Sequence, residues 1–236
     1  MTKIILNKSH PIFIAFIANH RFVKFLKTEL YYKKFFFSAK FQSRVLKMKK
    51  KIIFTGPPFA GKTSIRLFFF EKTHPIDILP PNSIEPTRGI HWINYTNSGY
   101  DLGVCDSSGQ EISQIIRDKE LFQGSDIVIF QFDITDLEFE ELKQDYIDYL
   151  MQLLSIREQL GEEYEIVVFC HKIDLIKREE LKEVKNKIKN IILNAITDQY
   201  GYHHGISIFF TSVKSFHADS THNLLRKIVL YQTVTL

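Results

Sequence analysis

The stretch GPPFAGKT, from Gly56 to Thr63, decides how the rest of the chain is interpreted. It has a glycine, four intervening residues and then Gly-Lys-Thr, which is the spacing of a phosphate-binding loop. The apolar run KIIFT (51–55) precedes it and TSIRLFFFEK (63–72) follows as an expected helix, so the required strand–loop–helix context is met. We expect main-chain N–H groups to surround the phosphates, Lys62 to reach the β- and γ-phosphates, and Thr63 to bind Mg²⁺.

The 236 residues suit one globular domain with an appendage, since 44% of them are hydrophobic and 25% are charged. Ten of the 31 Lys/Arg and one of the 27 Asp/Glu lie in residues 1–47, so this segment carries +9 and residues 48–236 carry −5. The basic character belongs to the first segment alone, so we expect no nucleic-acid binding by the main domain. Cys105 and Cys170 lie in apolar runs without a paired or metal-binding spacing, which favours a reducing, cytoplasmic compartment.

Two interpretations of residues 1–47 are open. The segment is basic and rich in Phe and Tyr, and Phe22, Leu26 and Leu30 recur at helical spacing. The first interpretation is a targeting segment: a helix that lies on a membrane surface, which would place the protein at the periphery of a membrane, or a transit-like presequence. The alternative is a dispensable extension, or upstream sequence wrongly joined to the reading frame, because MKKKIIFTG from Met48 starts as a compact nucleotide-binding domain does. We favour this second interpretation and divide the chain at 1–47 and 48–236.

Strand and helix patterns alternate from Lys51 onward. The continuous apolar runs DIVIFQFD (126–133) and EIVVFC (165–170) are typical of central parallel strands that are covered on both faces. This predicts an α/β, P-loop NTPase fold with a doubly wound, mostly parallel six-stranded sheet and helices on both faces. The remaining expected elements are strands at 90–96, 100–105 and 206–211, the first two joined by a hairpin at 97–99, and helices at 136–160, 177–200 and 223–231.

Three further motifs follow expected strands or lie in a loop. Asp106-Ser107-Ser108-Gly109-Gln110 offers a carboxylate for Mg²⁺ through water, a Gly109 N–H for the γ-phosphate, and Gln110 to orient an attacking water. Thr87 in a proline-rich loop offers a hydroxyl to Mg²⁺ and an N–H to the γ-phosphate. Taken singly, each of these two motifs also fits an ordinary polar turn.

The third of these motifs is HKID, at 171–174. A carboxylate such as Asp174 can accept parallel hydrogen bonds from N1–H and the exocyclic amine of guanine, whereas adenine offers no such pair of donors. Lys172 can lay its apolar stem over the base. Alone, this motif also fits a helix-capping aspartate beside a basic residue. After a phosphate-binding loop, it favours GTP over ATP.

From about Met48 to its end, the chain resembles a small GTPase of the Ras superfamily, and within it the Rag/Gtr branch. GKTSIR (61–66), the histidine of HKID where most small GTPases have asparagine, and FFTSV (209–213) carry this resemblance. The resemblance implies that Ser212 places its main-chain N–H near the guanine O6. It implies effectors, a GTPase-activating protein and an exchange factor as partners, with a second GTPase as dimer partner.

The sequence departs from that branch in several places. Rag proteins continue into a roadblock-type dimerisation domain, which the given sequence lacks, and VCDSSGQ replaces a tryptophan and paired glycines common in Rag and Arf proteins. An Arf-like or MglA-like GTPase is thus an alternative placement. Pro58 stands where Ras-like proteins usually keep a glycine beside the γ-phosphate, and Phe59 follows it.

The expected function is a molecular switch that binds GTP or GDP with Mg²⁺ and hydrolyses GTP slowly. The alternative is a nucleotide-bound scaffold that does not hydrolyse. Metal binding by His203, His204, His217 and His222 is a weaker idea, since their spacing matches no ligand pattern. The expected catalytic residues are Gln110 and Lys62, and the expected metal ligands are Thr63, Thr87 and Asp106. The expected nucleotide-binding residues are Gly56, Pro57, Pro58, Phe59, Ala60, Gly61, Lys62, Thr63, Ser64, Thr87, Gly109, His171, Lys172, Asp174, Thr211, Ser212 and Val213.

Overall fold

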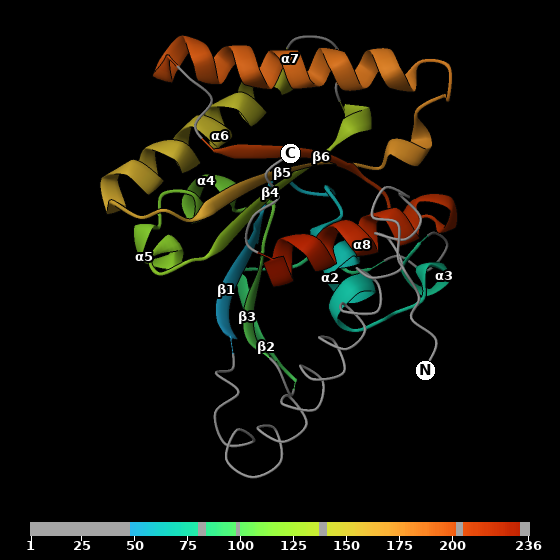
Figure 1. Cartoon of the computed structure of the whole chain (residues 1–236), viewed down its shortest axis with the longest axis horizontal. Coiled ribbons are helices and arrows are strands. Elements are labelled where there is room, and N and C mark those ends of the chain that lie inside the picture. Colours follow the sequence, from blue (N-terminus) through green and yellow to red (C-terminus); the bar gives the residue numbers. More distant parts are fainter. Residues whose placement is uncertain (1–47, 80–83, 98–99, 137–140, 202–204, 232–236) are drawn as a thin grey trace, which may run out of the picture. The chain divides into compact units, whose positions relative to one another are not determined.

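The computed structural model describes residues 48–79, 84–97, 100–136, 141–201 and 205–231, all of which belong to one compact unit (Figure 1). Residues 1–47, and with them both interpretations of the N-terminal segment, lie outside the described residues. The strands are β1 (Met48–Thr55), β2 (Ile90–Asn97), β3 (Tyr100–Ser107), β4 (Ile127–Asp133), β5 (Glu165–His171) and β6 (Ile206–Thr211). The helices are α2 (Lys62–Phe70), α3 (Pro75–Ile78), α4 (Ile112–Ile115), α5 (Lys119–Phe122), α6 (Glu141–Leu160), α7 (Leu181–Tyr200) and α8 (Ser215–Tyr231).

The six strands form one sheet in the order β2-β3-β1-β4-β5-β6. Only β2 runs antiparallel, pairing with β3 from Ile90↔Ser107 to Asn97↔Tyr100, and the other neighbours are parallel. The predicted fold class is therefore confirmed. Because β1 lies between β3 and β4, the loop after β1 emerges where the chain order of the sheet reverses, which is where α/β sheets bind ligands.

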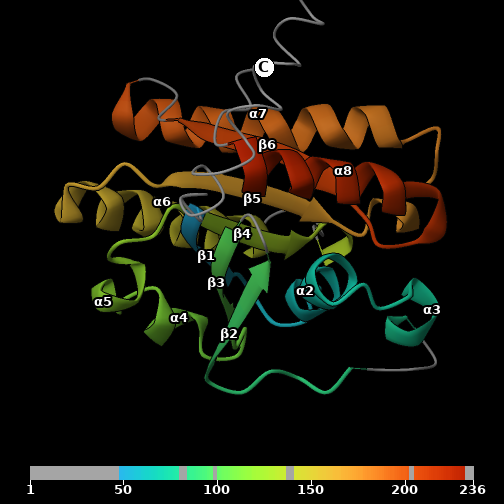
Figure 2. The same ribbon diagram turned by 60° about the horizontal axis from the view of Figure 1, so that its bottom comes forward.

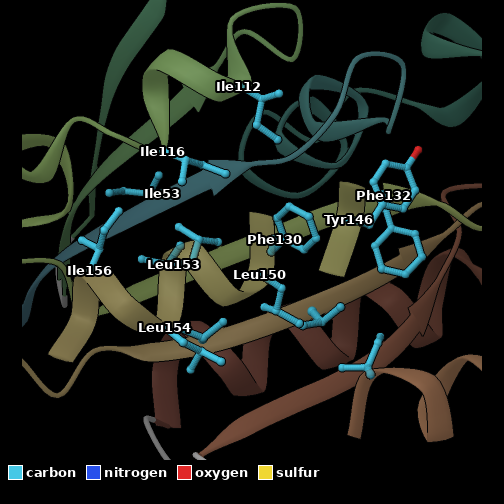
Figure 3. Close-up of a cluster of buried hydrophobic side chains, with 14 of the residues drawn as sticks. Ile53, Ile112, Ile116, Phe130, Phe132, Tyr146, Leu150, Leu153, Leu154 and Ile156 are labelled. Atoms are coloured by element: carbon cyan, nitrogen blue, oxygen red, sulfur yellow. The ribbon is translucent and has the colours of Figure 1, made fainter. Parts of the chain in front are cut away.

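Successive residues of the central strands face opposite sides of the sheet, and each side has its own core. Ile53, Val128 and Phe130 pack with α4, α5, α6 and α7, whereas Ile52 and Phe54 pack with α2, α3 and α8. Figure 2 shows helices on both sides of the strands, and Figure 3 shows apolar side chains of α6 directed at β1 and β4. Both faces being covered explains why β4 and β5 are almost continuously apolar.

Several helix boundaries differ from the sequence prediction. Helix α8 begins at Ser215 instead of residue 223, and the N–H groups of His217 and Ala218 donate to the Lys214 carbonyl at its start. Thr221 in its second turn accepts the Ser212 N–H and donates to the Ser212 carbonyl. Of the helix expected at 136–160, α6 is described from Glu141 to Leu160, Asp136 instead ends a 3₁₀ turn at Ile134–Asp136, and residues 137–140 lie outside the described residues. Helix α7 begins at Leu181 rather than 177, the short helix α3 lies in the proline-rich stretch expected as a loop, and the short helices α4 and α5 were not predicted. None of these differences alters the order of the strands.

Candidate functional site

The carboxyl ends of the central strands surround a cavity of about 300 Å³, which lies at the lower limit for small-molecule sites. The phosphate-binding loop follows β1, the Asp106–Gln110 motif ends β3, and His171 ends β5. Segments far apart in the sequence thus share one edge of the sheet. The cavity is lined by Pro58, Phe59, Ala60, Gly61, Lys62, Thr63, Ser64, Ile78, Leu79, Ile84, Glu85, Pro86, Thr87, Ser107, Gly109, Gln110 and Lys172.

The phosphate-binding loop is seated on β4 and β5, and its two glycines are required by close contacts. A Cβ atom at Gly56 would lie 1.9 Å from the main-chain oxygen of Gln131, and one at Gly61 would lie 2.6 Å from Cδ2 of His171. Both glycines also have positive φ angles, of 142° and 85°. Gln131 is fully buried and donates from Nε2 to the Ala60 carbonyl at 2.6 Å, so it holds the loop from below.

Pro58 and Phe59 change both the hydrogen-bond donors and the exposed surface of this loop. Neither Pro57 nor Pro58 carries an N–H, so apart from Gly56 the main-chain donors of the loop come from Phe59 onward. Phe59 adopts a left-handed φ of 59° and leaves 72% of its surface exposed, which is a strained conformation for a bulky residue. A Cβ at Gly109 would lie 2.4 Å from the Pro58 nitrogen, so only glycine lets the β3 motif approach the loop this closely.

Lys62 is the charged group at the centre of the site. It is 6% exposed, and its Nζ donates to the carbonyl oxygens of Gly56 and Pro57, each at 2.8 Å. Burial lowers the pKa of Lys62 to about 8, against the opposing effect of the negative charge of Asp106. A desolvated ammonium inside a phosphate-binding loop is a strong attractor for a phosphate anion.

The oxygen atoms near Lys62 fit a magnesium ion. The hydroxyls of Thr63 and Thr87 are 2.8 Å apart, although the two residues come from α2 and from the loop before β2. Asp106 is 2% exposed, and its Oδ1 atom is buried with no hydrogen-bond partner among the described residues. Two hydroxyls and a carboxylate oxygen that lacks a partner are the hard ligands that Mg²⁺ prefers.

A second group of predicted residues lies at the ends of β5 and β6. Ser212 donates its hydroxyl to Oδ1 of Asp174, and Lys214 places Nζ 3.9 Å from Oδ2 of the same carboxylate. Lys172 has a left-handed φ of 65° and forms an ion pair with Asp133. Hydrogen bonds thus hold Asp174 and the 211–213 loop beside each other, while Lys172 of the same motif reaches the lining of the cavity.

One expectation about this region is wrong. The main-chain N–H of Ser212 donates to Oγ1 of Thr221 at 3.1 Å, so it is not available to guanine O6. The Lys214 N–H donates to the Ser212 hydroxyl at 3.0 Å. The N–H of Val213, which lies between these two residues, therefore becomes our candidate donor to guanine O6, and the hydroxyl of Ser212 donates to Asp174.

His171 joins the two halves of the site. It is fully enclosed under the phosphate-binding loop beside Gly61, and its Nδ1 lies 3.0 Å from Oγ1 of Thr211. Burial, and to a lesser extent the charge of Lys172, lowers the pKa of His171 to about 4. The imidazole is therefore neutral near pH 7 and acts as packing and a hydrogen-bond partner.

This burial predicts a pH dependence of stability. The unfolded chain takes up a proton on His171 below its ordinary pKa of about 6.5, whereas the folded chain does so only near 4, so stability falls as the pH drops through this window. At pH 5 the loss from this residue is on the order of 2 kcal/mol. Urea unfolding of the wild type and of His171→Asn checks this, and we expect their difference in unfolding free energy to shrink from pH 7 to pH 5. Parallel pH curves for the two proteins would contradict it.

Two residues of the site were not singled out from the sequence. Gln131 interrupts the apolar residues of the buried strand β4 before its final Asp133, and that interruption is a signal that could have been used. Arg66 is buried in α2 and donates from Nε to Oδ2 of Asp106 at 3.0 Å. Of the four histidines considered as metal ligands, His217 and His222 are described, and no group of three or more candidate ligands occurs in the described residues.

Comparisons with known proteins agree with this geometry. The family model "Gtr1/RagA G protein conserved region" matches residues 51–228, which is most of the chain. The chain belongs to the Gtr1/RagA family of G proteins. It is thus a small GTPase of the Ras superfamily, and the expected Rag/Gtr placement is confirmed over an Arf-like or MglA-like one. The matched residues of this G protein include the phosphate-binding loop, the Asp106 motif, HKID and the 211–213 loop.

A relative of this G protein among curated proteins is the Ras-related protein RabQ of Dictyostelium discoideum. The two are 31% identical over 106 residues, which are 44% of this chain and 50% of RabQ. The chain therefore spans about half the length of the curated relative that it matches. Membership of a G-protein family establishes the general type of the protein, a guanine-nucleotide-binding GTPase.

Proposed function

We propose that this G protein binds GTP with Mg²⁺, hydrolyses it slowly to GDP and phosphate, and changes the conformation of its loops between the two states. The observation that carries the proposal is the contact between the Thr63 and Thr87 hydroxyls at the cavity, and the buried Oδ1 of Asp106 without a hydrogen-bond partner in the described residues supports it. Thr63 and Thr87 line the same cavity as Lys62, and the charge of Asp106 acts on Lys62, at the edge of the sheet where phosphates bind in such folds. Thr87 reaches this place from a loop, so that loop is ordered by the triphosphate and released after hydrolysis.

In this proposal the chain's residues act on the γ-phosphate through position and charge. Lys62 exchanges its two carbonyl acceptors for phosphate oxygens, and Thr63, Thr87 and Asp106 hold the ion, which supplies positive charge to the β- and γ-phosphates. Gln110 is exposed and lines the cavity, where its side chain orients the attacking water. Pro58 and Phe59 crowd the space where that water must sit, so intrinsic hydrolysis is slow.

Guanine specificity comes from the loops after β5 and β6. Asp174 accepts from N1–H and the exocyclic amine of guanine, the stem of Lys172 covers the base, and the N–H of Val213 faces O6. The hydroxyl of Ser212 bonds one oxygen of Asp174 and so fixes the orientation of the carboxylate. The base is therefore bound by a group that is already in place.

Partner proteins would set the rate and the location of the switch. In the described residues, Arg66 is bound to Asp106, and no arginine lines the cavity, so an activating protein that inserts an arginine would raise hydrolysis by about 10³–10⁵-fold. An exchange factor and effectors that contact the loop of Thr87 complete the cycle. The protein works in the cytoplasm, with residues 1–47 available to a membrane surface. None of the described helices is both long and apolar enough to cross a bilayer.

Replacing Gln110 with Leu tests the hydrolytic part of this proposal. We expect single-turnover phosphate release from bound GTP to slow by about tenfold or more, because the water loses its orienting amide. The affinity for GTP should stay within about twofold, since Gln110 contacts the water and not the ground-state nucleotide. Phosphate release is measured with the full chain, and Gln114→Leu, which alters an exposed glutamine nearby on α4, is the matched control. GTP binding without release in either protein would favour a nucleotide-bound scaffold that does not hydrolyse.

A further inference from the structure

A charged cluster behind the metal position has no part in the mechanism above. Arg66 of α2 donates from Nε to Oδ2 of Asp106 at 3.0 Å and from Nη1 to the hydroxyl of Tyr95 at 3.1 Å. Nη1 also forms an ion pair with Glu71, which is the last, capping residue of α2. Tyr95, on β2, donates its hydroxyl to the same Glu71 carboxylate at 2.8 Å. One guanidinium thus lies between two carboxylates, and only one of these belongs to the metal position.

The two carboxylates differ strongly in exposure. The side chain of Asp106 is 2% exposed, that of Arg66 is 11% exposed, and that of Glu71 is 39% exposed. A buried carboxylate without a counter-charge is strongly destabilising, whereas an exposed one is solvated by water. Asp106 therefore needs a cation whenever magnesium is absent, while Glu71 does not.

Arg66 is the group that meets this need. Lys62 is the other cation whose charge acts on Asp106, but its Nζ is bonded to the carbonyls of Gly56 and Pro57. Arg66 bonds Oδ2 of Asp106 and leaves Oδ1 buried without a partner. The metal-facing oxygen is thus free while the carboxylate as a whole is already paired.

We propose that Arg66 is the counter-cation that Asp106 keeps when magnesium leaves, and that Glu71 shares Arg66 so that Asp106 can still accept the metal. The inference rests on the proposed function, because it needs a guanine nucleotide held with Mg²⁺. When the ion arrives, its charge repels the guanidinium, and Glu71 offsets this repulsion by remaining paired with Arg66. The cluster therefore lowers the difference in energy between the magnesium-bound and magnesium-free protein, and so sets how readily the ion and the nucleotide are released.

Two substitutions in this cluster should act in opposite directions. Arg66→Met leaves Asp106 without a counter-cation in the magnesium-free state, so we expect magnesium to be held more tightly. Glu71→Gln leaves the guanidinium charge to Asp106 alone, so we expect magnesium to be held less tightly. If Arg66 and Glu71 only stabilised the fold, both variants would bind magnesium less tightly than the wild type.

The experiment measures release of a fluorescent GDP analogue from the full chain across a series of buffered free Mg²⁺ concentrations. The readout is the Mg²⁺ concentration that halves the release rate. Arg66→Met should lower this concentration by about fivefold or more, as for a moderate coupling between two sites. Glu71→Gln should raise it by about twofold to fivefold, the smaller effect of a partly exposed ion pair. Glu183→Gln removes one exposed negative charge on α7, distant in sequence from this cluster, and is the matched control, expected within about twofold of wild type.

The outcomes separate this inference from the proposed function. A rise in the half-effect concentration in Arg66→Met, or an unchanged value in both variants while the wild type responds to Mg²⁺, would overturn the inference alone. Release from the wild type that does not depend on Mg²⁺ would overturn both the inference and the magnesium part of the proposed function. If Arg66→Met does not fold, Arg66→Gln takes its place, because it removes the charge but keeps a donor for Asp106, and it should lower the half-effect concentration in the same direction.

Discussion

Lys62→Ala is expected to lose tight nucleotide binding, with GTP and GDP affinities falling by about 10²–10³-fold, as for truncation of one partner of a buried charged pair. Lys62 is almost fully buried in the phosphate-binding loop, and its Nζ already lies between two loop carbonyls. Alanine removes both the positive charge and the donors that replace water around the phosphates. Isothermal calorimetry or competition with a fluorescent nucleotide on the full chain measures the loss.

The same substitution should not unfold the protein, which makes the result interpretable. Because burial lowers the pKa of Lys62 to about 8, the fold disfavours the charged side chain when no anion is present. The nucleotide-free protein should therefore melt at or slightly above the temperature of the wild type, and added GTP should no longer raise that temperature. Lys119→Ala, on the exposed surface of α5, is the control and should bind normally. Unchanged GTP affinity in Lys62→Ala would show that the site is assigned to the wrong residues.

Asp174→Asn is expected to reverse the choice of base. The carboxylate accepts two hydrogen bonds from guanine, and each bond to a charged group contributes about 1.5–3 kcal/mol, so GTP affinity should fall by about 10²-fold or more. The asparagine amide places a donor against the exocyclic amine of guanine, but against a carbonyl oxygen in xanthine. Xanthosine triphosphate should therefore bind the variant better than it binds the wild type.

The gain for xanthosine triphosphate is the internal control for Asp174→Asn. Asn keeps an oxygen for the hydroxyl of Ser212, so the connection between the loops after β5 and β6 is preserved. Competition of the two triphosphates against a fluorescent nucleotide gives both affinities in one assay. If the affinities for both triphosphates fall equally, Asp174 stabilises the loop and does not recognise the base. If GTP binds as before, recognition lies elsewhere.

Much of the fold could be predicted from local sequence patterns. The strand–loop–helix context of GPPFAGKT placed β1 and α2 within a few residues, and the continuous apolar runs identified β4 and β5 as central strands. These features depend on neighbours in the sequence and on burial of both sheet faces. The start of α8 was not predicted, because its first turns have no clear apolar period. The bonds of Thr221 to Ser212 in that part of the helix depend on the fold and cannot be seen in the sequence.

The site was predictable as a set of motifs and not as a set of contacts. The order of the motifs placed Lys62, Thr87 and Gln110 around one cavity. The direction of the Ser212 N–H, by contrast, depends on Thr221 in a helix that the sequence pattern placed further on. The pairing of Arg66 with Asp106 joins α2 to β3, and only the packing of that helix on the sheet determines it.

A guanine-nucleotide switch must bind GTP far more tightly than ATP, so the affinities of this G protein for the two nucleotides are the decisive measurement. Both are measured with the full chain in Mg²⁺ by competition with one fluorescent nucleotide, and phosphate release is followed in the same samples. We expect GTP to bind at least about 10²-fold more tightly than ATP, as the two hydrogen bonds to Asp174 require, with slow release of phosphate. Equal affinity for ATP and GTP would contradict it.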